Sequence, residues 1–140
     1  MTTIDETAER DVAAVLERYR AGFADLDPIA LKEIWDQAHE DLVYLASEET
    51  RPRRTWQDIS DYYDSLQGHP DDRAVSMDWE ELSVSVLGDV AHAFGRFRFV
   101  GERSGPEDRF VIEGRSTFVL RRRELRWLVV HYHESMPPQR

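Results

Sequence analysis

The apolar residues of this chain change their spacing once, near residue 70, and this change limits the folds open to it. Up to residue 66 they recur every three or four positions, as on one face of a helix. After the linker 68–74, GHPDDRA, they alternate with polar residues, as on a strand with one buried face. Helices followed by a sheet predict an α+β domain in which the helices pack on one face of the sheet.

Three helices are expected in the first half of the chain. The first covers residues 4–25, where Thr3 and Glu6 would form a capping box. The second begins at Pro28, because an aspartate before a proline is a common helix start, and its apolar pattern continues to Ala38. The third follows Thr55.

Strands account for the rest. A short apolar run at 42–46 suits a strand between the second and third helices, and four long strands follow the linker. Gly88 and Asp89 would supply positive φ angles in the first tight hairpin turn. The last two strands cover residues 110–122 and 126–135, and Glu124 and Leu125 form the turn between them.

Composition narrows the class of protein. A length of 140 residues suits one domain, 1–140, with a single core. The net charge of −10 opposes binding to nucleic acid or anionic membranes, since phosphate contacts rely on Lys and Arg. The absence of cysteine excludes disulfides and thiol nucleophiles. An acidic N-terminus and no long apolar run predict a cytoplasmic protein.

The C-terminal hairpin carries a family resemblance. The segments GRSTFVLRR and RWLVVHYHESMPP resemble the terminal hairpin of SnoaL-like domains, and RWLVVHYHES also resembles the association domain of calcium/calmodulin-dependent protein kinase II. The shared residues are Trp127, His131, His133 and Ser135. The order of elements is similar to that of the nuclear transport factor 2-like superfamily. This resemblance implies a cone-shaped fold, with three N-terminal helices on a strongly bent antiparallel sheet that encloses a hydrophobic pocket.

A second resemblance lies in VLERYRAGFADLD, which is similar to the first helix of ketosteroid isomerases. It places Tyr19 on the tyrosine that donates a hydrogen bond to the enolate oxygen in that family. The family's general-base aspartate has no counterpart, because Leu45, Ala46 and Ser47 occupy that region. Asp41 and Glu48 are the nearest replacements for this base, and both also fit the role of solvated loop carboxylates. A counterpart of the family's protonated carboxylic acid is also missing, so a steroid isomerase itself is not expected.

Arg115, His131 and His133 are the first candidates for catalysis, together with Tyr19. An arginine on an otherwise apolar strand binds an anion or forms a buried salt bridge. The two histidines share one face of their strand and suit general acid or base chemistry, since imidazole titrates near neutral pH. They equally suit a framework role, with hydrogen bonds to the backbone or to Ser135.

A pair of histidines two positions apart also occurs in metal sites, but a third ligand is needed. His92 or Glu134 could be proposed, yet Glu134 points to the opposite face of the strand. No metal site is therefore expected. Aromatic and polar residues suited to lining a ligand pocket, or simply to filling the core, are Tyr44, Trp56, Tyr62, Trp79, Phe97 and Ser135.

Two functions fit these observations. The first is a cofactor-independent isomerase, cyclase or lyase that acts by proton transfer on an apolar carbonyl compound. Tyr19 or Arg115 would stabilise the oxyanion, and a histidine would move the proton. The second is a non-catalytic module that binds an apolar or anionic small molecule, or forms a homodimer through the outer face of the sheet. That face would include Phe118 and Leu120 or the residues alternating with them.

Overall fold

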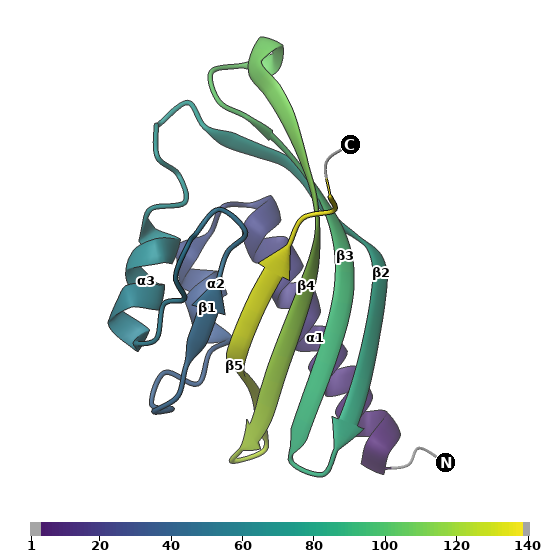
Figure 1. Cartoon of the computed structure of the whole chain (residues 1–140). Coiled ribbons are helices and arrows are strands. Elements are labelled where there is room, and N and C mark those ends of the chain that lie inside the picture. Colours follow the sequence, from purple (N-terminus) through teal and green to yellow (C-terminus); the bar gives the residue numbers. More distant parts are fainter. Residues whose placement is uncertain (1–3, 139–140) are drawn as a thin grey trace.

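Three helices cover one face of a five-stranded sheet (Figure 1). The structure is a computed structural model that describes residues 4–138, so the capping residue expected at Thr3 lies outside the described part. None of the described helices is long and apolar enough to cross a membrane. In chain order the elements are α1 Ile4–Ala24, α2 Pro28–Glu33, β1 Val43–Leu45, α3 Trp56–Asp64, β2 Arg73–Leu87, β3 Val90–Glu102, the single-turn 3₁₀ helix η1 Pro106–Asp108, β4 Arg109–Arg123 and β5 Arg126–Ser135.

The sheet has the order β1-β5-β4-β3-β2, and its four long strands form an antiparallel meander. The sheet is mostly antiparallel as expected, and at its edge β1 pairs with β5 in parallel. The reason lies just after α2. The backbone N–H of Val129 donates to the carbonyl of Ile34, and the N–H of Asp36 donates to the carbonyl of Val129. The segment after α2 therefore runs alongside β5 and parallel to it. For the same reason α2 ends at Glu33, earlier than the apolar pattern predicted.

An aromatic cluster joins the helices to the sheet. The Tyr19 ring of α1 lies 5.0 Å from that of Phe118 in β4, and Phe118 lies 4.9 Å from Tyr132 in β5. Tyr132 in turn stacks on Tyr44 of β1 at 4.9 Å. All four side chains are at most 3% exposed, so burial of large aromatic surface fixes α1 and β1 on the inner face of the sheet.

The long strands curve along their length in Figure 1, and their pairing is interrupted at defined places. Register shifts occur between Ala74 and Ser76 and between Trp79 and Glu81 in β2. Such irregularities increase the local twist of a strand pair. β2 begins at Arg73, inside the linker expected at residues 68–74. The linker is therefore shorter than predicted, and β2 is longer.

Glycines on the inner face lie directly beneath aromatic rings. A Cβ atom added to Gly95 would come within 2.6 Å of the Trp79 ring, and one added to Gly114 within 2.6 Å of the Phe97 ring. Phe110 is seated on Gly101 in the same way. The rings can approach the backbone this closely only because these positions carry no side chain.

The two hairpin turns obtain their geometry differently. Gly88 alone has a positive φ, 63°, in the β2–β3 turn, whereas Asp89 was also expected to have one. Glycine as the first central residue is typical of a type II′ turn. In the β4–β5 turn Glu124 and Leu125 have φ angles of 51° and 69°. Two positive φ angles indicate a type I′ turn, here built without glycine.

Replacing Glu124 and Leu125 by Asn and Gly should therefore stabilise the protein. The left-handed conformation costs an ordinary residue about 1 kcal/mol, and the side chain of Leu125 is 90% exposed, so no packing is lost. We expect the free energy of unfolding in urea to rise by about 1 kcal/mol in this double variant. Gly88→Ala is the control with the opposite sign, and a lower stability of the double variant would contradict the turn geometry.

Candidate functional site

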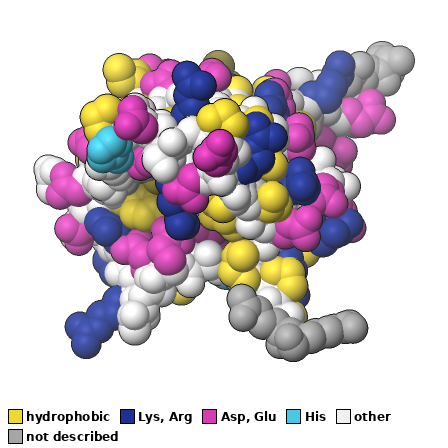
Figure 2. Space-filling model, turned by 90° about the horizontal axis from the view of Figure 1, so that it is seen from above, with side chains coloured by type: hydrophobic (Ala, Val, Ile, Leu, Met, Phe, Trp, Pro, Cys, Tyr) yellow, Lys and Arg dark blue, Asp and Glu magenta, His cyan; other side chains and the backbone are white. Residues whose placement is uncertain are grey.

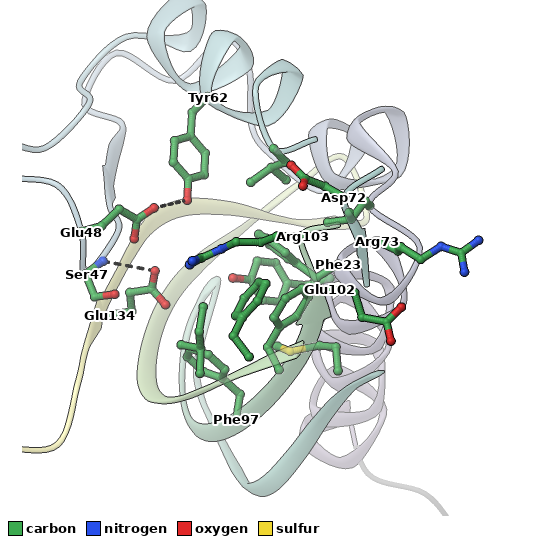
Figure 3. A pocket seen from close by; sticks show the side chains of 17 residues that line it. Phe23, Ser47, Glu48, Tyr62, Asp72, Arg73, Phe97, Glu102, Arg103 and Glu134 are labelled. Atoms are coloured by element: carbon green, nitrogen blue, oxygen red, sulfur yellow. Dashed lines mark hydrogen bonds between the residues drawn. The ribbon is translucent and has the colours of Figure 1, made fainter. Parts of the chain in front are cut away.

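A cavity of about 350 Å³ opens between the helices and the inner face of the sheet (Figure 3). Its walls come from α1, α3, the loop after β1 and the four long strands. Figure 2 views the molecule from above and shows hydrophobic side chains between acidic and basic ones. The volume lies in the range of about 300–1,000 Å³ that small-molecule sites occupy. Apolar wall residues include Phe23, Leu66, Met77, Phe97, Phe99 and Ile112.

Glu134 is a carboxyl group held inside this apolar cavity. It lies on the inner face of β5, where the backbone N–H of Ser47 donates to its Oε1 at 3.2 Å and the Tyr132 hydroxyl donates to its Oε2 at 3.1 Å. Burial raises the pKa of Glu134 to about 7, the charge of Glu48 adds to the rise, and the two hydrogen bonds oppose it. At neutral pH the group is therefore present in both its acidic and its basic form.

A second carboxyl group lies on the same side of the cavity. The Tyr62 hydroxyl of α3 donates to Oε1 of Glu48 at 2.8 Å, and Figure 3 shows Glu48 and Glu134 near each other at the loop after β1. Burial, and then the negative charge of Glu48, raise the pKa of Tyr62. Tyr62 thus stays neutral and holds the Glu48 carboxylate in place.

Tyr19 contributes a phenol that stays protonated. Its side chain is 3% exposed and lines the cavity. Burial raises the pKa of Tyr19 well above its ordinary value, and Tyr132 and Glu134 raise it further. Nearby, the hydroxyls of Tyr132 and Ser116 lie 3.0 Å apart. The Glu134 carboxyl group of β5 is therefore accompanied by neutral hydroxyl groups from α1, β4 and β5 itself.

Some of the ligand-binding residues expected from the sequence line the cavity and others do not. Tyr19, Tyr62 and Phe97 line it. Tyr44 packs behind Tyr62, with ring centroids 4.7 Å apart, and is fully buried. Two tryptophans pack against the core without lining the cavity, Trp56 and Trp79.

The structure corrects the expected position of Arg115, His131, His133 and Ser135, because none of them lines the cavity. Arg115 pairs across the strands with Ser135, and their side chains lie on the outer face of the sheet. The Arg115 guanidinium donates to the Ser135 hydroxyl and to the carbonyl of Met136, so it forms no buried salt bridge. Tyr132 and Glu134 occupy the inner face instead.

The two histidines interact with each other. Nε2 of His131 lies 3.0 Å from Nδ1 of His133, at hydrogen-bonding distance, and Thr117 and Val119 are their cross-strand neighbours. Partial burial, His133 and Arg54 together lower the pKa of His131. Among the described residues, no three acidic or histidine side chains are grouped so that they could hold a metal ion.

Sequence reasoning missed Glu134 as a cavity residue. It noted that Glu134 points away from the histidines but assigned the cavity to the histidine side of the strand. The burial pattern decides between the sides, because the flanking Tyr132 is 1% exposed and belongs to the aromatic cluster. Glu48 was proposed as a replacement base, and it does line the cavity.

The fold is that of the nuclear transport factor 2-like superfamily, and the chain belongs to the SnoaL-like domain family, which it matches over residues 12–139. A nuclear transport factor 2-like superfamily protein from Salmonella enterica is similar at 19% identity, with a TM-score of 0.79 over 95% of this chain and 93% of that one. A comparison with curated protein sequences finds no match.

Two further solved structures share the fold. A candidate ketosteroid isomerase from Parabacteroides distasonis is 22% identical, with a TM-score of 0.69 over 96% of this chain and 89% of that one. A candidate calcium/calmodulin-dependent protein kinase II association domain from Xanthomonas campestris is also 22% identical, with a TM-score of 0.74 over 94% of this chain and 89% of that one. Identities this low establish a common fold and leave the chemistry to the site itself.

The raised pKa of Glu134 predicts a specific dependence of stability on pH. Between pH 4.5 and about 7 the folded state keeps a proton that the unfolded state has lost, so stability falls as the pH rises through this window. The full shift corresponds to at most about 3 kcal/mol. Glu134→Gln should remove this loss, because its amide can pair with Ser47 and Tyr132 without a charge.

Urea unfolding at pH 5, 6, 7 and 8 measures this effect. The stability of Glu134→Gln relative to wild type should increase across the series and level off above about pH 8. Glu81→Gln is the control, because Glu81 lies on the surface beside Arg96. A constant difference between Glu134→Gln and wild type at every pH would show that Glu134 ionises normally.

Proposed function

We propose that this protein binds a small, mostly apolar carbonyl compound in its cavity and catalyses proton transfer on it without a cofactor. The observation that carries the proposal is the Glu134 carboxyl group, which lines the cavity in a partly buried position beside aromatic side chains and has a pKa near 7. A general base works best when its pKa is close to the working pH. Isomerisation, cyclisation and elimination all begin with the step that such a group performs.

In that step the ionised Glu134 removes a proton from the carbon next to the substrate carbonyl. The electron pair of the broken C–H bond moves toward the carbonyl oxygen and forms an enolate. The Tyr19 hydroxyl, which stays protonated at neutral pH, donates a hydrogen bond to this oxygen. The protonated Glu134 then returns the proton to another carbon or to a leaving group, so neither oxidant nor metal is needed to balance the reaction.

The supporting residues follow from the contacts around Glu134. Tyr132 and Ser47 fix the orientation of the carboxyl group through their hydrogen bonds. Glu48, held by Tyr62, raises the pKa of Glu134 and so makes it a stronger base once ionised. Glu134 thereby takes the proton-transfer role that the sequence had suggested for His131 or His133, while Tyr19 keeps its expected role.

Turnover on a panel of ketones and enones tests this assignment. Glu134→Gln should lower kcat by at least about 100-fold, the usual contribution of a general base, and Tyr19→Phe should lower it less. The kcat/KM of wild type should rise with pH through an apparent pKa of about 7. His131→Ala and Arg115→Ala are matched controls on the outer face and should keep the wild-type rate. Full activity of Glu134→Gln would remove the proposal.

A second candidate function is assembly into a homodimer through the outer face of the sheet. Phe118 and Leu120 are buried in the core, so the alternating residues Thr117 and Val119 belong to this face instead. Phe94, the cross-strand neighbour of Thr117, is 36% exposed. Phe94 and Val119 share this face with Arg115, His131 and His133, and exposed apolar side chains on a sheet face favour contact with a second copy of the chain.

Sedimentation at micromolar concentration tests the dimer. Wild type should sediment at twice the chain mass of 16.4 kDa, and Phe94→Glu should sediment as a monomer, because it places a charge on the proposed dimer face. Leu125→Glu changes an exposed residue at a hairpin tip and should leave the dimer intact. A wild-type species of 16.4 kDa alone would refute the dimer.

A further inference from the structure

The rim of the cavity carries an arginine that stacks on an aromatic ring and has no acidic partner among the described residues. Arg103 follows β3, and its guanidinium carbon lies 4.7 Å from the centre of the Phe110 ring. Figure 3 shows the side chain reaching over the cavity toward the side of Glu48 and Glu134. Stacking on an aromatic face restricts the guanidinium while leaving its N–H edges free.

Two acidic side chains that line this end of the cavity already accept hydrogen bonds. Glu102 is 4% exposed and accepts a hydrogen bond from Arg109 at 2.8 Å. Asp72 accepts a hydrogen bond from the backbone N–H of His69. Within residues 4–138 Arg103 forms no ion pair, so its guanidinium is available to a group from outside the chain.

We propose that the ligand of this cavity is an oxo-carboxylate: an apolar or aromatic carbonyl compound whose carboxylate is bound by Arg103 at the rim. This inference rests on the proposed function and names the substrate class. A planar guanidinium binds a carboxylate through two parallel N–H···O bonds, which also fixes the orientation of the ligand. The apolar body then lies among the Phe97 and Phe99 side chains, with its carbonyl end toward Glu134.

A cationic ligand fits the same cavity less well. The Glu48 carboxylate already accepts a hydrogen bond from Tyr62, and that of Glu134 accepts two. A cation entering the cavity would also pass Arg103. The net charge of −10 repels an anion at long range. At physiological salt, however, charges more than about 8 Å away are largely screened, so the nearby Arg103 guanidinium determines which charge the ligand can carry.

Arg73 provides a matched control, because it also lines the rim but points away from the cavity in Figure 3. The probes are benzoylpropionate, its neutral methyl ester and the amine analogue aminobutyrophenone, with binding measured by calorimetry. Wild type should bind the carboxylate about tenfold more tightly than the ester, the effect of one charge-assisted hydrogen bond. Arg103→Gln should lose this preference, Arg103→Lys should keep part of it, and Arg73→Gln should keep all of it.

Other outcomes overturn the inference. A preference for the carboxylate that survives in Arg103→Gln would place the anion elsewhere, and tightest binding of the amine would indicate a cationic ligand. Absence of binding by all three probes would refute an oxo-carboxylate site of this size. Glu134→Gln separates the two proposals. If it keeps both turnover and the preference for the carboxylate, proton transfer by Glu134 fails while the binding role of Arg103 stands.

Discussion

The two-residue period of β5 determines which polar side chains meet the cavity. Tyr132 belongs to the buried aromatic cluster with Tyr19, Tyr44 and Phe118, so its side of the strand must face the helices. Glu134, two residues later, is then carried into the same apolar space, and His131 is turned outward. The packing of one tyrosine thus places the carboxyl group on which the proposed chemistry depends.

The pKa of Glu134 is set by two opposing effects, the apolar surroundings and a few hydrogen bonds. Aromatic side chains remove water and favour the neutral acid, whereas Ser47 and Tyr132 favour the carboxylate. The result is a pKa of about 7, which suits the proposed proton transfer at neutral pH. β1 matters here although it is short, because its parallel pairing with β5 brings the loop containing Ser47 to this carboxyl group.

Much of the fold could be predicted from local patterns. The helices, the long strands and the family resemblance were confirmed. The buried face of β5 could not be predicted in the same way, because the alternation of side chains along a strand defines two faces but does not identify the buried one. The parallel pairing of β1 and the position of Arg103 depend on contacts between distant segments, which no local pattern contains.

The glycines beneath the aromatic rings have a consequence for how such a protein diversifies. Phe97 rests on Gly114, and Phe110, which carries the Arg103 guanidinium, rests on Gly101. A methyl group introduced at either glycine would displace the ring above it. The shape of the cavity would then change, although the residues that line it stay the same. Selection for a new substrate can therefore act on backbone positions that no substrate ever touches.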